Sequence, residues 1–239
     1  MVKSFSNKIN KMKGELMIPE SYLTGQVRKS EILIVFLVVI SFAIGIYIYP
    51  QMPEQMASHW GIEGQVDGYM SKFWGIFLMP IISLVLALLF ILLPKIDPLK
   101  NNIEQFRKYF DGFIIIIFLF FLYIYGLTIY WNLGHIFNMG GYMTPAMAIL
   151  FYYCGILIKN SKRNWFIGIK TPWTLSSDVV WDKTHKVGAK LFKASAIICL
   201  LGLIWPLYAM WFVLVPILFS TIFVFIYSYL EFKKLNKVV

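Results

Sequence analysis

The sequence predicts an all-α integral membrane protein with six transmembrane helices and with both termini in the cytoplasm. Three observations support this prediction. The chain of 239 residues is 59% hydrophobic and only 14% charged, whereas soluble domains are about a quarter charged. Its apolar residues form six long runs without an interior ionisable side chain. Its basic residues are concentrated in alternate connections between these runs.

Each apolar run is close to the length that a membrane crossing requires. A spanning helix needs about 20 mostly apolar residues to cross a hydrocarbon core of about 30 Å. Prolines within such spans are tolerated and can kink the helix, as we expect for spans two, four and six. The six expected spans are residues 32–49, 74–93, 113–131, 142–158, 191–207 and 210–230.

The lysine and arginine residues predict the orientation. All 22 of them except Lys72 lie in the N-terminal lead, in the segments 95–108 and 159–193, or in the C-terminal tail. By the positive-inside rule these segments are cytoplasmic, and the localisation predicted is the plasma membrane. The net charge of +10 therefore reflects topology and contact with membrane lipid, and direct nucleic-acid binding is not predicted.

The chain divides into four expected sections. The basic lead contains Phe5, Ile9, Met12 and Leu16 at the spacing of an amphipathic helix on the membrane surface, with a disordered basic tail as the alternative. The sections are a lead (1–30), an N-terminal membrane domain (31–100) with an outward loop (50–73), a second membrane domain (101–232) with a cytoplasmic segment (159–190), and a tail (233–239).

The cytoplasmic segment after span four is expected to lie along the membrane interface, because residues 164–177 are aromatic but interrupted by glycine and proline. Ser176 or Ser177 can then cap a helix that we expect to continue from 178 to about 206. This helix should have one packed face and one basic, solvated face. The packed face holds Trp181, His185, Gly188 and Phe192, and the basic face holds Lys183, Lys186, Lys190 and Lys193.

The outward loop is expected to be compact, because Gly64 permits a tight turn and Asp67-Gly68 is itself a turn signal. In this interpretation Asp67 caps its own turn, while Trp60 and Tyr69 lie at the lipid headgroups.

Metal binding is the alternative interpretation of the outward loop. His59, Glu63 and Asp67 are ligand types, and His135 should reach the same side of the membrane. Their spacing matches no recognised zinc motif, so we predict no metal site.

Enzymatic and coupled-transport functions are disfavoured. The sequence has no nucleophile elbow, phosphate-binding loop or dinucleotide-binding motif, and no cofactor is predicted. Asp178 and Asp182, near His185, are expected to complete a helix N-terminus and to pair with Lys183 or Lys186. Coupled transporters usually carry ionisable side chains within their spans, and the interiors of these spans have none.

Two segments together resemble a known family. The outward loop resembles the pattern L-P-x-x-I-P-x-H-x-x-x-x-G-x-x-D-x-Y-x-S-K of a small membrane domain of uncharacterised function, matched by Pro53, His59, Trp60, Gly64, Asp67, Gly68, Tyr69, Ser71 and Lys72. The segment 164–188 resembles the SdpI family of bacterial toxin-immunity membrane proteins. Its corresponding residues are Asn164, Gly168, Lys170, Thr171, Pro172, Trp173, Ser177, Trp181, His185 and Gly188.

The resemblance implies a non-enzymatic membrane protein that recognises a secreted peptide toxin outside and can hold a small transcriptional repressor inside. The outward loop would bind the toxin, and the segment 164–188 would be the cytoplasmic docking element or a structural brace. Lys170 replaces the usual arginine, which argues against a bidentate grip on an anion there. A transporter of a lipid or hydrophobic peptide and a metal-dependent membrane enzyme remain as alternatives.

Overall fold

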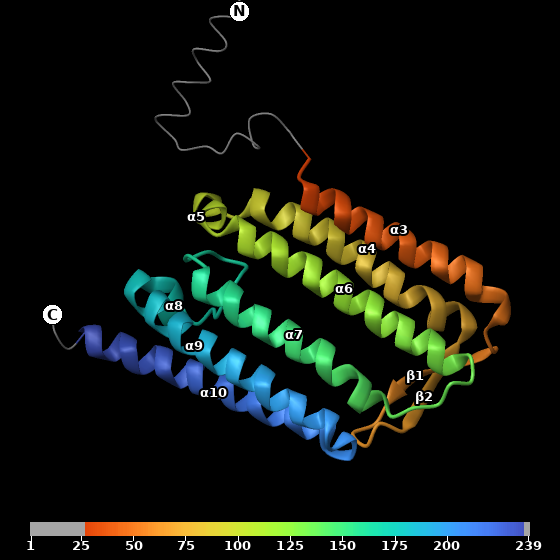
Figure 1. Cartoon of the computed structure of the whole chain (residues 1–239). Helices are drawn as coiled ribbons and strands as arrows, with labels where there is room; N and C mark the ends of the chain where they lie inside the picture. Colours follow the sequence, from red (N-terminus) through yellow and green to blue (C-terminus); the bar gives the residue numbers. More distant parts are fainter. Residues whose placement is uncertain (1–26, 237–239) are drawn as a thin grey trace, which may run out of the picture.

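The computed structural model describes residues 27–236, so the expected amphipathic helix of the N-terminal lead lies outside the described residues. Within that range, six long helices run roughly side by side between two ends of the molecule (Figure 1). One end carries a β-hairpin, and we call it the hairpin end. The other end carries both ends of the described chain and most of its lysines, and we call it the basic end.

The first three long helices form one packed group. They are α3 (Lys29–Ile48), α4 (Lys72–Ile96) and α6 (Arg107–Asn132), with the short α5 (Lys100–Gln105) between the last two. Ile34, Phe110 and Phe118 are almost fully buried where these helices meet. The packing thus groups α6 with α3 and α4, while the domain division at residue 100 stays a prediction.

The other three long helices form a second group. They are α7 (Met139–Asn160), α9 (Asp178–Cys199) and α10 (Ala209–Asn236), and α8 (Pro172–Ser176) lies in the segment before α9. α9 packs against both α7 and α10, and α7 also contacts α6 of the first group. The two groups therefore meet mainly along α6 and α7 (Figure 1).

The chain is a multi-pass membrane protein. Among residues 27–236, five helical stretches are long and apolar enough to span a bilayer: Lys29–Gln51, Lys72–Ile96, Arg107–Asn132, Met139–Asn160 and Pro206–Asn236. α9 is not among them, because charged residues from Asp178 to Lys193 occupy most of its length.

The expected continuous helix from 178 to 206 is confirmed as far as Cys199 and is wrong beyond it. α9 ends at Cys199 and is followed by two short 3₁₀ helices, Leu200–Leu203 and Pro206–Tyr208. Pro206 lacks a backbone N–H and disfavours a helical conformation at Trp205, whose φ of −125° and ψ of 76° are not helical.

The outward loop contains two short strands, which the sequence did not predict, within a fold that is mostly helical as expected. β1 (Gln55–Trp60) and β2 (Val66–Ser71) pair antiparallel, with His59 opposite Gly68. The connecting turn is closed by hydrogen bonds from the Gly61 N–H to the Gln65 carbonyl (2.8 Å) and from the Gly64 N–H to the Gly61 carbonyl (2.9 Å). Gly64 has φ of 79°, a conformation that glycine adopts without strain.

Candidate functional site

The hairpin is anchored on the helices by buried apolar side chains in and just before β1. Met56 and Ala57 of β1 are fully buried, and Met52 just before β1 is nearly so. These methionines pack in a cluster with Ile76 of α4 and Tyr125 of α6. The hairpin is therefore a rigid cap on the helix ends and not a free loop. This agrees with the compact outward loop that the sequence predicts.

Two asparagines that the sequence reasoning missed fix the hairpin to both helix groups. The Ala57 N–H donates to Asn132 Oδ1 (2.8 Å), and Asn132 Nδ2 donates back to the Ala57 carbonyl (3.0 Å). Asn138 Nδ2 donates to the Glu63 carbonyl at the tip (2.9 Å), while its Oδ1 caps α7 by accepting from the Gly141 N–H (3.0 Å). The sequence shows that Asn138 lies at the end of the connection between α6 and α7. It does not show that Asn138 contacts Glu63, which is distant in the chain.

The outer face of the hairpin presents an exposed cluster of polar and aromatic side chains. His59 Nδ1 and Asp67 Oδ1 are hydrogen bonded across the strands, and both side chains are mostly exposed, 73% and 52% respectively. Asp67 thus pairs with His59 and does not cap its own turn as expected. Tyr69 is exposed, and so is Pro53 before β1.

The remaining predicted loop residues have structural contacts. Trp60 packs edge-on against Trp131 of α6, with ring centroids 6.0 Å apart. Lys72 pairs with Glu54 (3.3 Å) and lies over the Tyr49 ring. The hydrogen of Gly68 faces His59, since a β-carbon there would lie 2.9 Å from the His59 Cβ. In the described part of the chain, no three His, Cys, Asp or Glu side chains gather closely enough to hold a metal ion.

At the basic end, Asn164 organises the segment before α8. It is fully buried, and its side-chain oxygen accepts from the backbone N–H groups of Phe166 (2.9 Å) and Ile167 (2.6 Å). Its amide donates to the carbonyls of Lys162 and Ile167, both at 2.8 Å. One side chain therefore replaces the hydrogen bonds that regular secondary structure would supply to this buried loop.

The loop then passes directly over α9 at Gly168. This residue has φ of 118°, and a β-carbon added to it would lie 2.5 Å from His185 Nε2 and 3.2 Å from the Trp181 ring. Ile169 follows and occupies the space above Gly188, where an added β-carbon would lie 2.4 Å from its Cδ1. Both glycines are therefore required for the segment to lie this close to α9.

Trp181 and His185 form the buried base of this contact. Their rings stack with centroids 4.0 Å apart, and Trp181 Nε1 donates to the Ser161 carbonyl (3.0 Å). The Ile169 N–H donates to His185 Nε2 (2.9 Å), so the ring proton is on Nδ1, which donates to the Trp181 carbonyl (2.8 Å). Burial lowers the pKa of His185 from 6.5 to about 4, which keeps the ring neutral.

The turn of α8 connects the segment to α10. Thr171 caps α8 by accepting from the Thr174 N–H (3.2 Å), and its hydroxyl also donates to Ser228 Oγ of α10 (3.0 Å). Trp173 packs on the rings of Phe225 and Tyr229 of α10, at 5.2 and 5.1 Å between centroids. Pro172 begins α8 and is exposed, and Lys170 is exposed as well.

Ion pairs near the N-terminal end of α9 differ from expectation. Ser177 caps α9 by accepting from the Val180 N–H (3.4 Å), as predicted. Asp178, however, pairs with Arg163 (2.7 Å) and not with a lysine of its own helix. Lys183 pairs with Glu231 of α10 (2.8 Å). The predicted basic face is otherwise confirmed, since Lys186 and Lys190 are exposed.

A buried charge cluster links α3, α5 and α6 at the same end, and the sequence reasoning missed it. Arg107 lies 2.8 Å from Asp111, 3.6 Å from Glu104 and 3.9 Å from Glu31, and its side chain is only 8% exposed. Arg28 also pairs with Glu104 (2.9 Å). The spacing of Arg107 and Asp111 along one helix was the available sequence signal.

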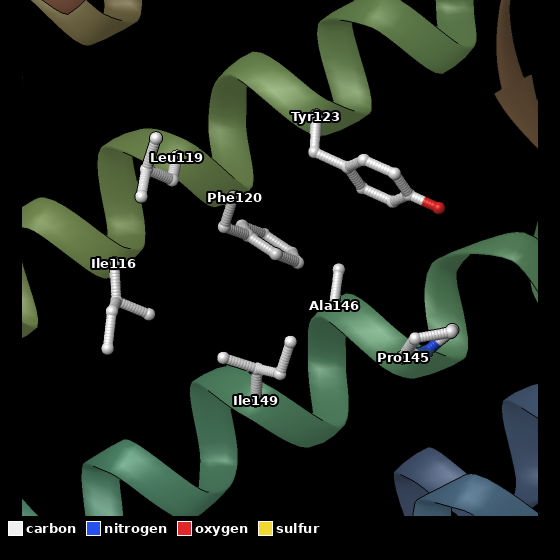
Figure 2. A pocket seen from close by; sticks show the side chains of 7 residues that line it. All are labelled: Ile116, Leu119, Phe120, Tyr123, Pro145, Ala146 and Ile149. Carbon is white, nitrogen blue, oxygen red and sulfur yellow. The ribbon is translucent and has the colours of Figure 1, made fainter.

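Apolar hollows flank α7 in its central part. One of about 310 Å³ lies between α6 and α7, where Figure 2 shows Phe120 and Tyr123 of α6 facing Ala146 and Ile149 of α7. A second of about 390 Å³ lies between α7 and α9. Pro145 of α7 lines both hollows.

Comparison with known proteins places both segments in context. Residues 36–84, which include both strands of the hairpin, match a Domain of unknown function (DUF1648), and residues 160–228 match the SdpI/YfhL protein family. Over 210 residues the chain is 27% identical to the Immunity protein SdpI of Bacillus subtilis (strain 168), an alignment that covers 87% of this chain and 98% of that protein. The resemblance to the SdpI family is confirmed. No solved structure matches the chain.

The match to the SdpI family covers the basic-end segment, α9 and most of α10, and therefore the contacts between them.

Buried His185 is expected to make the stability of the protein depend on pH. The unfolded chain binds a proton at His185 near pH 6.5, but the folded protein does so only near pH 4. Stability is therefore complete above pH 6.5 and falls as the pH decreases toward 4, by about 2 kcal/mol at pH 5.

Thermal unfolding of purified protein between pH 7.5 and 5 measures this loss. His185→Gln retains a donor and an acceptor but does not titrate, so its pH dependence should be smaller than that of the unmodified protein. His135→Gln, at an exposed position, should leave the pH dependence unchanged. Equal slopes for all three proteins would contradict the prediction.

Proposed function

We propose that this chain is a non-enzymatic immunity and signal-transduction protein of the plasma membrane, which recognises a secreted peptide toxin at its hairpin end. The observation that carries the proposal is the similarity to Immunity protein SdpI, which covers 98% of that protein. A similarity of this extent includes both the hairpin and the basic-end segment.

The proposed topology has six crossings with the basic end in the cytoplasm. Both ends of the described chain lie at the basic end (Figure 1), which requires an even number of crossings. Five helical stretches qualify as spans, and the apolar last turns of α9 after Lys193, together with the 3₁₀ helix that follows, would supply the sixth. The lysines at the basic end support a cytoplasmic location by the positive-inside rule.

The hairpin suits recognition because its exposed groups sit on a rigid support. His59, Asp67 and Tyr69 are exposed, while Met56 and Ala57 of β1 are buried. A preorganised surface loses little conformational entropy when it binds a peptide.

The hairpin also contacts both helix groups, through Asn132 of α6 and Asn138 before α7. A toxin bound at the tip would therefore act on the junction between the groups. Such a junction is where a change in helix arrangement could reach the basic end.

For the basic-end segment, we divide the two roles between different residues. Asn164, Thr171, Trp181 and His185 are buried, and the hydrogen bonds of Trp181 and His185 to the segment and of Thr171 to α10 support a bracing role. The exposed residues Trp165, Phe166, Lys170 and Pro172 form the surface on which a small repressor would dock.

Substitution of the hairpin tests recognition. In cells sensitive to a secreted peptide toxin, Asp67→Asn should reduce the tolerated toxin concentration about tenfold, because it removes the charge-assisted pair with His59 on the exposed face. Glu63→Gln is the matched control, since it removes one carboxylate from the same hairpin and should keep protection.

Membrane abundance must be equal in all strains, and Gln65→Cys should react with a membrane-impermeant thiol reagent from outside while Lys170→Cys should not. Labelling of Lys170→Cys from outside would overturn the topology. Full protection by Asp67→Asn would refute toxin binding at this face.

Two other results would favour the alternative functions. Uptake of a labelled lipid or peptide into proteoliposomes would favour transport, and stoichiometric metal that is lost in His59→Ala would favour a metal enzyme.

A further inference from the structure

The hollow between α7 and α9 is apolar in its depth and basic at its rim. It has a volume of about 390 Å³. Its lining comes from α7 and from the end of α9, namely Pro145, Ala148, Ile149, Tyr152, Tyr153, Ala196, Ile197 and Leu200. Ile149 and Ile197 are among the most exposed apolar side chains of the two helices, so the hollow opens toward the surrounding lipid.

Lysines continue the same stripe of α9 toward the basic end. At 100° per residue, Lys186, Lys190, Lys193 and Ile197 lie within about 60° of arc. Lys193 is one turn from Ile197, and its ammonium lies 5.1 Å from the centre of the Tyr152 ring, which lines the hollow. Its aliphatic stem rests against Gly155 of α7, where an added β-carbon would lie 2.8 Å from Lys193 Cγ.

These lysines lack the carboxylate partners that other basic residues of this end possess. Lys183 on the same helix pairs with Glu231, and Arg163 pairs with Asp178. Within residues 27–236, no carboxylate lies within ion-pair distance of Lys186, Lys190 or Lys193. Their positive charge is therefore available to an anion at the level where the helices leave the bilayer.

We propose that this groove binds an anionic phospholipid of the cytoplasmic leaflet. An acyl chain lies against Ile149, Tyr152 and Ile197, and the headgroup phosphate contacts Lys190 and Lys193. The charge of the rim selects an anionic over a zwitterionic headgroup, because each lysine near a membrane surface attracts anionic lipid. The inference rests on the proposed topology, which places the basic end at the cytoplasmic leaflet, but not on toxin recognition.

Thermal unfolding of the purified full-length protein in a neutral detergent tests the proposal. Added phosphatidylglycerol should raise the Tm by about 5 °C, since a ligand that binds only the folded state stabilises it. Phosphatidylcholine with the same acyl chains and soluble glycerol 3-phosphate should raise the Tm much less. These two probes separate the headgroup charge from the acyl chain.

Substitutions locate the site. The double variant Lys190→Gln/Lys193→Gln should lose at least half of the phosphatidylglycerol shift, and Ile197→Trp, which fills an exposed part of the groove, should lose it as well. The control Lys95→Gln/Lys170→Gln removes two exposed lysines elsewhere at the basic end and should retain the full shift.

Three results would overturn the proposal. An equal Tm rise with phosphatidylcholine would show filling of an apolar groove without headgroup selection. A rise with glycerol 3-phosphate would show a site for a soluble anion. Equal losses in the two double variants would show a general effect of charge at this end. Toxin protection is a separate measurement, so failure here leaves the proposed immunity function to be judged on its own.

Discussion

Gly168→Ala is expected to destabilise the protein by about 3 kcal/mol. A non-glycine residue at φ of 118° costs about 1–3 kcal/mol of backbone strain, and a methyl group forced into a packed contact adds about 1–3 kcal/mol. The added carbon would lie 2.5 Å from His185 Nε2 and would push the segment away from the stacked Trp181 and His185 rings. The tryptophan fluorescence of detergent-purified protein during thermal unfolding measures the loss.

Two other glycines of the same chain separate the causes of this effect. Gly126 in α6 has open space around its α-carbon, so Gly126→Ala should have almost no effect. Gly134 has φ of 98° but no neighbour within 4 Å of an added β-carbon, so Gly134→Ala should show backbone strain alone. If Gly168→Ala is no less stable than Gly134→Ala, the close contact with α9 does not exist.

Arg107→Met should be the most destabilising single substitution at the basic end, at about 3–5 kcal/mol. The substitution leaves Glu31, Glu104 and Asp111 close together and largely buried without the arginine between them. Removing one partner of a buried ion pair is costly because the remaining charges keep their desolvation penalty. We expect a much lower Tm in detergent and a reduced amount of protein in the membrane.

Lys108→Met is the control for this substitution. Lys108 is the next residue of α6, is exposed and lies over the Tyr109 ring, so the variant loses the same charge at the same depth. It should cost less than about 1 kcal/mol, in line with surface substitutions. A similar loss in both variants would mean that positive charge near the membrane, and not the buried cluster, accounts for the effect.

The residues whose environment depends on distant parts of the chain were the least predictable. Asn132 and Asn138 hold the hairpin only because its strands fold back onto α6 and α7. The strands themselves were missed because the loop was interpreted through its turn residues and not through the apolar Met56 and Ala57, which are buried only in the folded protein. Similarly, Asp178 pairs with Arg163 because the segment between them folds into a closed loop.

The sequence alone determined that this is a multi-pass helical membrane protein and that it resembles the SdpI family. Transfer of long apolar runs from water into lipid is so favourable that no tertiary contact is needed to predict it. Only the tertiary structure decided which polar residues are exposed and which are structural. His59 and Asp67 are exposed while His185 and Arg107 are buried, because burial and partner choice depend on elements that meet only after folding.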